Sequence, residues 1–133
     1  MDANEKYEYW LDIAQYDLET AGAMLSGERW LYVVFMCQQA IEKLVKGLYS
    51  LYLDDNIPKT HNIPTLVERF EDKLPAPVSE DMYDLFESLS SYYLNNRYPD
   101  FLNKLSGQVG ELEAKEMLSR TKEVFKWLLT LKP

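Results

Sequence analysis

The stretch Val33 to Leu53, VVFMCQQAIEKLVKGLYSLYL, carries two apolar rows where a surface helix needs only one. The first row has gaps of four and three and comprises Trp30, Val34, Cys37, Ile41, Leu44, Leu48 and Leu51. The second row has the same spacing and comprises Phe35, Gln38, Glu42, Val45, Tyr49 and Tyr52. Two adjacent apolar rows predict a helix that is packed on two sides, at the centre of a helical bundle.

The composition is that of a folded chain with an acidic surface. The 133 residues are 47% hydrophobic and 14% aromatic, so we expect one domain that spans 1–133. The formal net charge of −8 argues against binding to duplex DNA, which needs a basic surface, but leaves room for a local basic pocket that holds a small anion. With one Cys and one His, we expect no disulfide and no His/Cys zinc site. The sequence also lacks phosphate-loop and dinucleotide-binding motifs, and we expect no metal and no cofactor.

No part of the sequence predicts contact with a membrane. Residues 1–5, MDANE, lack the apolar core of a signal peptide. No uncharged run approaches the roughly 18 residues that a membrane span needs. Together with the single cysteine, which suits a reducing compartment, these features predict a cytoplasmic protein with no membrane span.

Hydrophobic spacing predicts helices on both sides of the central one. The first covers about 3–26, ends at Gly27, and forms an antiparallel hairpin with the central helix at about 29–53. A short helix follows at about 62–73, with Asn62 as its cap and Pro64 in its first turn. Helices at about 79–95, with Ser79 as N-cap, and at about 111–131 complete the set. Because no strand pattern survives, the sequence predicts an all-α fold, an up-and-down bundle of four long helices plus one short helix.

Gln39, Lys43 and Lys46 lie at i, i+4 and i+7 and therefore share one face of the central helix. Two ammonium groups and an amide are suited to holding phosphate oxygens. The alternative is a solvated stripe in which Glu42 pairs with Lys46 and contributes about 0.3–0.5 kcal/mol. The spacing alone leaves both interpretations open.

Gln38 and Glu42 interrupt the second apolar row, and buried polar groups need hydrogen-bond partners. One hypothesis is that tyrosine hydroxyls, or Asp17 and its neighbours on the first helix, supply those partners. Another is that the row from Phe35 to Tyr52 lies at an oligomer interface, because two apolar rows exceed what a small monomer needs to cover. This row is our candidate for a dimer cleft.

Polar chemistry also occurs outside the central helix. In RYPD (97–100), Arg97 can bind a phosphate through two hydrogen bonds, and Tyr98 can stack on a base. The alternative to ligand binding is a turn that ends the preceding helix, in which Arg97 pairs with Asp100. His61 is the only histidine and can act as a general base, serve as a structural cap or simply be exposed. Cys37 is predicted to be a buried core residue rather than a nucleophile.

Several of these segments together resemble the HEPN family, small helical domains named for nucleotide binding. They are WLDIAQYDLE (10–19) with Ala21, FMCQQAIEKLVKGL (35–48), HNIPTL (61–66) and RYPD (97–100), in an order and spacing that covers residues 8–131. The resemblance implies a helical bundle, usually dimeric, from bacteria or archaea. It also implies a gene that often lies beside a minimal nucleotidyltransferase, as one half of a toxin–antitoxin pair.

Many relatives in that family are metal-independent endoribonucleases with an Arg-x(4–6)-His motif at the dimer cleft. This sequence departs from the motif. The arginine would lie at positions 54–56, but these are Asp54, Asp55 and Asn56, and no histidine follows Arg97. The departure favours a non-catalytic role over ribonuclease activity.

The sequence therefore predicts a homodimeric binding module for a nucleotide or for a nucleotidyltransferase partner. The candidates for phosphate binding are Lys43, Lys46 and Arg97, and the candidate for base stacking is Tyr98. Orientation of the ligand is assigned to Gln38, Gln39, Glu42, Asp100 and His61. Two alternatives stay open: a ribonuclease that brings Arg97 and His61 together in space, and a pure protein-interaction domain.

Overall fold

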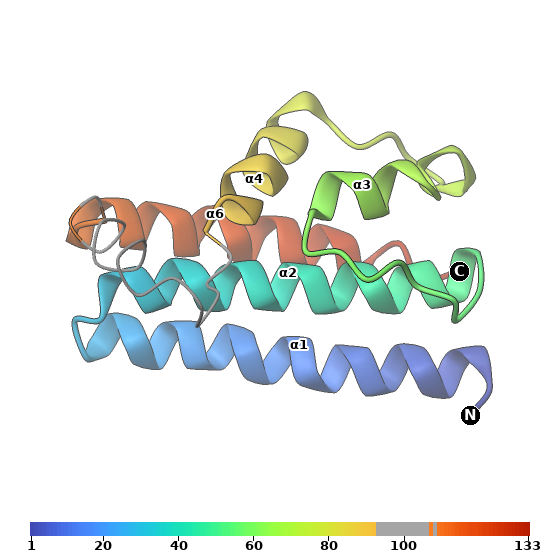
Figure 1. The fold of residues 1–133 in the computed structure, drawn as a ribbon, viewed down its shortest axis with the longest axis horizontal. Coiled ribbons are helices and arrows are strands. Elements are labelled where there is room, and N and C mark those ends of the chain that lie inside the picture. The colour runs from blue at the N-terminus through green and yellow to red at the C-terminus, as the bar shows by residue number, and fades with distance from the viewer. Residues whose placement is uncertain (93–106, 108) are drawn as a thin grey trace.

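The computed structural model describes residues 1–92, 107 and 109–133, and within these every regular element is a helix. The helices are α1 (Ala3–Ser26), α2 (Trp30–Tyr52), α3 (Ile63–Glu68), the 3₁₀ helix η1 (Glu71–Lys73), α4 (Glu80–Ser90) and α6 (Glu111–Leu129) (Figure 1). The all-α prediction is confirmed. The predicted central helix, about 29–53, agrees closely with α2.

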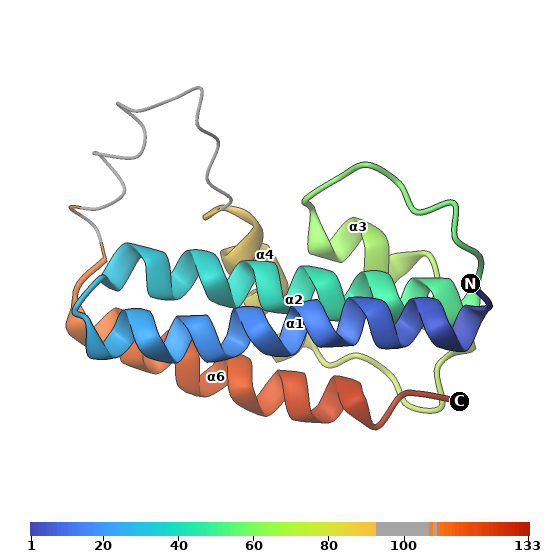
Figure 2. The same cartoon turned by 90° about the horizontal axis from the view of Figure 1, so that it is seen from below.

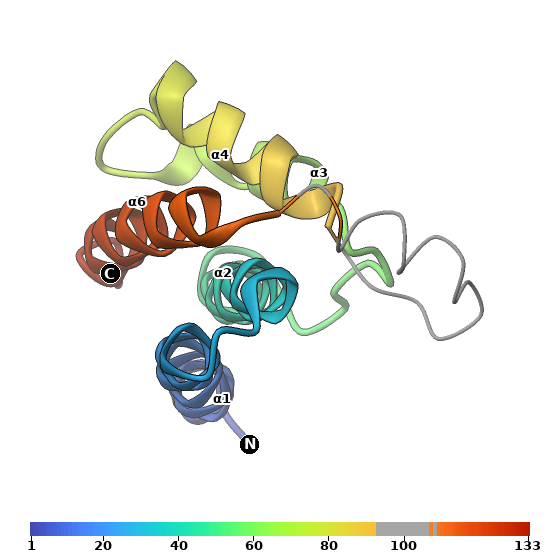
Figure 3. The ribbon, with the colours of Figure 1, turned by 90° about the vertical axis from the view of Figure 1, so that its left-hand side faces the viewer.

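α2 lies between α1 on one side and the remaining helices on the other (Figure 3). α1 and α2 form the predicted antiparallel hairpin, whereas α6 runs in the same direction as α2 (Figure 2). α3 runs in the same direction as α2, and the segment after η1 together with α4 leads the chain back toward the start of α6 (Figure 1). Both termini lie at the end of the molecule where α2 stops (Figure 2). The Tyr52 hydroxyl donates to the Leu131 carbonyl, which ties the end of α2 to the segment after α6. α2 is therefore the central helix, as its two apolar rows predict.

Local side-chain caps explain where several helices begin. The Asn62 side chain accepts a hydrogen bond from Thr65 N at 3.0 Å, and the Ser79 hydroxyl accepts one from Met82 N at 3.1 Å. Each cap satisfies a backbone N–H that has no partner within its helix. The predicted caps at Asn62 and Ser79 are therefore confirmed. α1 ends before Gly27 as predicted, although the left-handed residue of the link is Glu28, with φ 59°.

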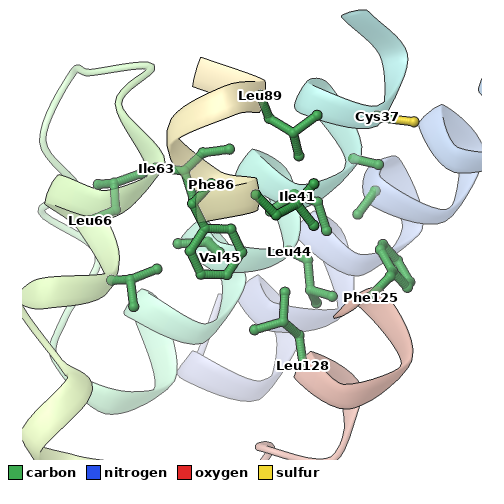
Figure 4. Close-up of a cluster of buried hydrophobic side chains, with 14 of the residues drawn as sticks. Cys37, Ile41, Leu44, Val45, Ile63, Leu66, Phe86, Leu89, Phe125 and Leu128 are labelled. Carbon is green, nitrogen blue, oxygen red and sulfur yellow. The ribbon is translucent and has the colours of Figure 1, made fainter. Parts of the chain in front are cut away.

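The first apolar row of α2 forms the centre of the hydrophobic core (Figure 4). Ile41, Leu44 and Leu48 are fully buried. Side chains from α3, α4 and α6 surround this row, among them Ile63, Leu66, Phe86, Leu89, Phe125 and Leu128. Cys37 is also fully buried, as predicted, and burial raises the pKa of its thiol to about 11.

The second apolar row of α2 is covered by the same chain, so the prediction that it forms a dimer cleft is wrong. Gln38, Glu42 and Val45 are at most 1% exposed. α3 and α4 pack against α2, and Phe70, which follows α3, stacks on Tyr52 with ring centroids 5.9 Å apart. The second row is therefore buried by α3, α4 and Phe70 of the same chain.

The fourth predicted helix is shorter than expected. The spacing predicts a helix from Ser79 to about residue 95, but α4 has 11 residues and ends at Ser90. Ser90 and Ser91 direct their hydroxyls at backbone carbonyls of the last turn, which competes with continuation of the helix.

Among the described residues, no helix is both long enough and apolar enough to cross a membrane.

Candidate functional site

The carboxylate of Glu42 is the centre of a polar network on α2. Gln38 Nε2 donates to Glu42 Oε1 at 2.7 Å, and Lys46 Nζ donates to Glu42 Oε2 at 3.0 Å. His61 Nδ1 lies 3.0 Å from Oε1 and 3.2 Å from Oε2. Because a carboxylate only accepts hydrogen bonds, this contact assigns the proton of the imidazole to Nδ1. Glu42 is only 1% exposed, so three donors replace the water that it loses.

The network also continues from Gln38 to Gln39 and Lys43 on the same helix. Gln39 Nε2 donates to Gln38 Oε1 at 2.6 Å, and Lys43 Nζ donates to Gln39 Oε1 at 2.7 Å. The shared face predicted for Gln39, Lys43 and Lys46 is confirmed, and so is the Glu42–Lys46 pair. The predicted partners of the buried pair are wrong, because its contacts come from α2 and His61 rather than from tyrosine hydroxyls or Asp17.

Packing of α3 on α2 places His61 over Glu42. Ile63 and Leu66 on α3 are fully buried, and Ile63 N–H donates to Ser90 Oγ at 3.0 Å, which fixes the start of α3 against α4. His61 directly precedes this anchored turn. Its side chain is 46% exposed while that of Glu42 is 1% exposed, so the imidazole bridges the buried carboxylate and the surface.

Two residues of α1 complete the electrostatic environment. Burial lowers the pKa of the Lys43 ammonium, and this effect outweighs the carboxylates of Glu42 and Asp17, which raise it. Burial also raises the pKa of Asp17, against the opposing effect of Lys43. On the other side of the network, Lys46 Nζ lies 5.9 Å from the centroid of the Trp10 ring, a cation–π distance. The ammonium groups thus face α1 as well as the core.

The sequence prediction of the site does not include Trp10, and it considers Asp17 only as a partner of Gln38 and Glu42 rather than of Lys43. The positions of Trp10 and Asp17 depend on the register of α1 against α2, which is set where Gly47 lets the two helices approach closely. A Cβ at Gly47 would lie 3.1 Å from Trp10 Cβ and 3.3 Å from Tyr7 Cδ2. In the sequence, a glycine inside an apolar helix, as Gly47 is in α2, indicates that another helix packs closely at that position.

The site offers the hydrogen-bond donors of Lys43 and Lys46, which lie beside the buried carboxylate of Glu42. A lysine ammonium has three donors, and the described contacts use one hydrogen from Lys43 and one from Lys46. In residues 1–92, 107 and 109–133, no group of three His, Cys, Asp or Glu side chains is placed to hold a metal ion. Arg97, Tyr98 and Asp100 lie outside the described residues.

Comparisons with known proteins agree with this architecture. The model of the HEPN domain matches residues 7–131. The chain belongs to the HEPN family. Among solved structures, this HEPN chain is similar to the crystal structure of TT1696 from Thermus thermophilus, with a TM-score of 0.76 and 25% sequence identity. That alignment covers 94% of this chain and 97% of the other. No curated protein sequence matches.

The segment before His61 in this HEPN chain has a structural role of its own. Asp55 is one of the three positions, 54–56, at which an Arg-x(4–6)-His motif ending at His61 would have its arginine, and it forms an ion pair with Lys6 of α1. Hydrogen bonding to Lys6 and the charge of Lys6 lower the pKa of the Asp55 carboxyl. This ion pair ties the loop that precedes His61 to α1.

Proposed function

We propose that this chain is a non-catalytic HEPN module that binds a nucleotide through its phosphates at Lys43 and Lys46. The observation that carries the proposal is the single hydrogen-bonded network that joins Lys43, Gln39, Gln38, Glu42, Lys46 and His61. Such a network holds long side chains in one geometry before a ligand arrives, which lowers the entropy lost on binding.

The charges of the network suit an anion that is small and highly charged. Lys43 and Lys46 keep hydrogen-bond donors for phosphate oxygens, while Glu42 and Gln39 fix the direction of each ammonium. The chain as a whole carries a net charge of −8, so this basic pair is a local exception on an acidic protein. On the sequence alone, Arg97 and Tyr98 are further candidates for phosphate and base, with Asp100 as an orienting residue.

Isothermal titration calorimetry with ATP, GTP, UTP and the corresponding diphosphates tests the proposal. The variants Lys43→Met and Lys46→Met should each weaken binding about tenfold or more, since a charge-assisted hydrogen bond contributes about 1.5–3 kcal/mol. Lys115→Met is the matched control, because Lys115 also pairs with a glutamate four residues away at 3.0 Å but is 58% exposed on α6. No binding of any nucleotide, or equal binding by the Lys43→Met variant and the control, would refute the site.

Family membership extends the proposal to the assembly. We infer a cytoplasmic homodimer that works beside a nucleotidyltransferase partner, as one half of a toxin–antitoxin pair. Light scattering should give a mass near twice 15.6 kDa, and a monomer at micromolar concentration would contradict the dimer. Co-purification with the product of a neighbouring nucleotidyltransferase gene tests the partner, and a chain that co-purifies but binds no nucleotide would be a pure interaction domain.

One contact favours a second candidate function, that of a ribonuclease. His61 Nδ1 is held by a buried carboxylate, an arrangement that orients histidines used in acid–base catalysis. Incubation of RNA with the wild type, His61→Ala and Arg97→Ala decides between the candidates. Cleavage that both substitutions abolish would establish the enzyme, whereas intact RNA with the wild type supports the binding module.

A further inference from the structure

A pocket is lined by residues from the start of α1, the end of α2 and the loop that follows α2. Figure 1 shows that α1 starts and α2 stops at the same end of the molecule. It has a volume of about 210 Å³. Its lining includes Lys6, Tyr9 and Trp10 from α1, Ser50 from α2, and Asp55 and Ile57 from the following loop. Two of these six residues, Trp10 and Ser50, also contact Lys46 of the network described above.

The walls of this pocket are aromatic and its rim is polar. The rings of Tyr9 and Trp10 lie with centroids 5.6 Å apart and planes at 74°, so they form a corner rather than a stack. Tyr9 is 52% exposed, so much of its side chain is accessible to a ligand. The Lys6–Asp55 ion pair adds one donor and one acceptor at the edge. A flat ring with a polar edge is the kind of ligand that fits such a corner.

Trp10 connects the pocket to the proposed phosphate site. Its ring centroid lies 5.9 Å from Lys46 Nζ. Ser50 lies one helical turn after Lys46, and its hydroxyl donates to the Lys46 carbonyl at 3.2 Å. A ligand that rests against Trp10 and Ser50 therefore has its next group within reach of the Lys46 ammonium. At the pocket rim, the charges of Lys6 and Asp55 pair with each other. Toward the network, the ammonium groups of Lys46 and Lys43 are positively charged donors that can hold phosphate oxygens.

We propose that this pocket holds the base of the nucleotide whose phosphates bind at Lys43 and Lys46. The inference rests on the proposed function and adds a second recognition element to it, an aromatic corner made by Tyr9 and Trp10. The base stacks on one of these rings and meets the other with its edge, while its polar groups meet Lys6 and Asp55 at the rim. The ligand class is thus a nucleoside phosphate rather than inorganic phosphate or a polyphosphate.

Calorimetric titration with ATP and with inorganic tripolyphosphate separates the base from the phosphates. The wild type should bind ATP at least about fivefold more tightly, although tripolyphosphate carries the greater negative charge, because base–aromatic stacking supplies a further factor of this size. Tyr9→Ala should remove that advantage and leave tripolyphosphate binding unchanged. Tyr9 is half exposed, so this substitution leaves the core intact. Tyr16→Ala is the matched control, since Tyr16 lies two turns further along α1 and is 71% exposed.

A second readout follows Trp10 itself. In a spectrum of the three tryptophan indole N–H groups, ATP should shift the Trp10 signal, assigned with Trp10→Phe, and leave that of Trp127 on α6 in place. Equal affinity for ATP and tripolyphosphate, with no effect of Tyr9→Ala, would overturn the base pocket while the phosphate site stands. Binding of neither ligand would overturn the proposed function and the pocket together.

Discussion

The substitution Glu42→Gln tests whether the buried network stabilises the fold. Glu42 is 1% exposed and accepts hydrogen bonds from Gln38, Lys46 and His61. A glutamine keeps the shape and one acceptor oxygen but turns an NH₂ group toward one of these donors. Removal of one partner of a buried ion pair costs about 3–5 kcal/mol. We expect about 3 kcal/mol here, because the Lys46 side chain keeps 14% exposure and some access to water.

The control for Glu42→Gln is a second pair with the same spacing and the same distance. Glu111 and Lys115 are also four residues apart with N–O 3.0 Å, but their side chains are 57% and 58% exposed. Glu111→Gln should therefore cost at most about 0.5 kcal/mol. Urea denaturation followed by far-UV circular dichroism measures both values, and a loss of 3 kcal/mol moves the midpoint by roughly 1–3 M. Equal midpoints for the two variants would refute the argument that burial makes the Glu42 network strong.

Three further predictions concern single positions. Since burial lowers the pKa of Lys43, ATP affinity should fall as the pH rises through that lowered value, before an ordinary lysine titrates. Lys43→Arg should flatten this pH profile measured by calorimetry, and an unchanged profile would contradict it. Cys37, with a pKa of about 11 and no exposure, should react with a thiol reagent at pH 8 only as fast as the protein unfolds; rapid labelling of the native protein would contradict this. Gly47→Ala should destabilise the α1–α2 contact by about 1–3 kcal/mol, because the new Cβ meets Trp10 at 3.1 Å. Gly22→Ala, with nothing within 4 Å, should instead stabilise α1 by about 0.5–1 kcal/mol in thermal melts, and similar effects of the two would refute the close approach.

Local patterns predict most of the fold because helix ends depend on neighbouring residues. Ser79 and Asn62 cap helices through hydrogen bonds that span only three residues, so the sequence contains the whole interaction. The same is true of the i, i+4 contacts of Gln39 with Lys43 and of Glu42 with Lys46. Periodicity alone is enough to place all four of these side chains.

Contacts between distant segments are the part that the sequence does not predict. The second apolar row of α2 is indistinguishable from a dimer interface until α3 and α4 are seen to cover it. His61 reaches Glu42 across 19 residues, and Trp10 reaches Lys46 only because Gly47 sets the register of α1 against α2. Each of these contacts follows from packing geometry, for which hydrophobic spacing gives a face but no partner.

A crystal structure of the chain with ATP tests the central claim most directly. We predict phosphate oxygens within hydrogen-bond distance of Lys43 Nζ and Lys46 Nζ, with Glu42 still bound to His61, and the adenine ring against Tyr9 and Trp10. ATP bound at another surface, with both lysines still in their present contacts and no phosphate beside them, would contradict the account.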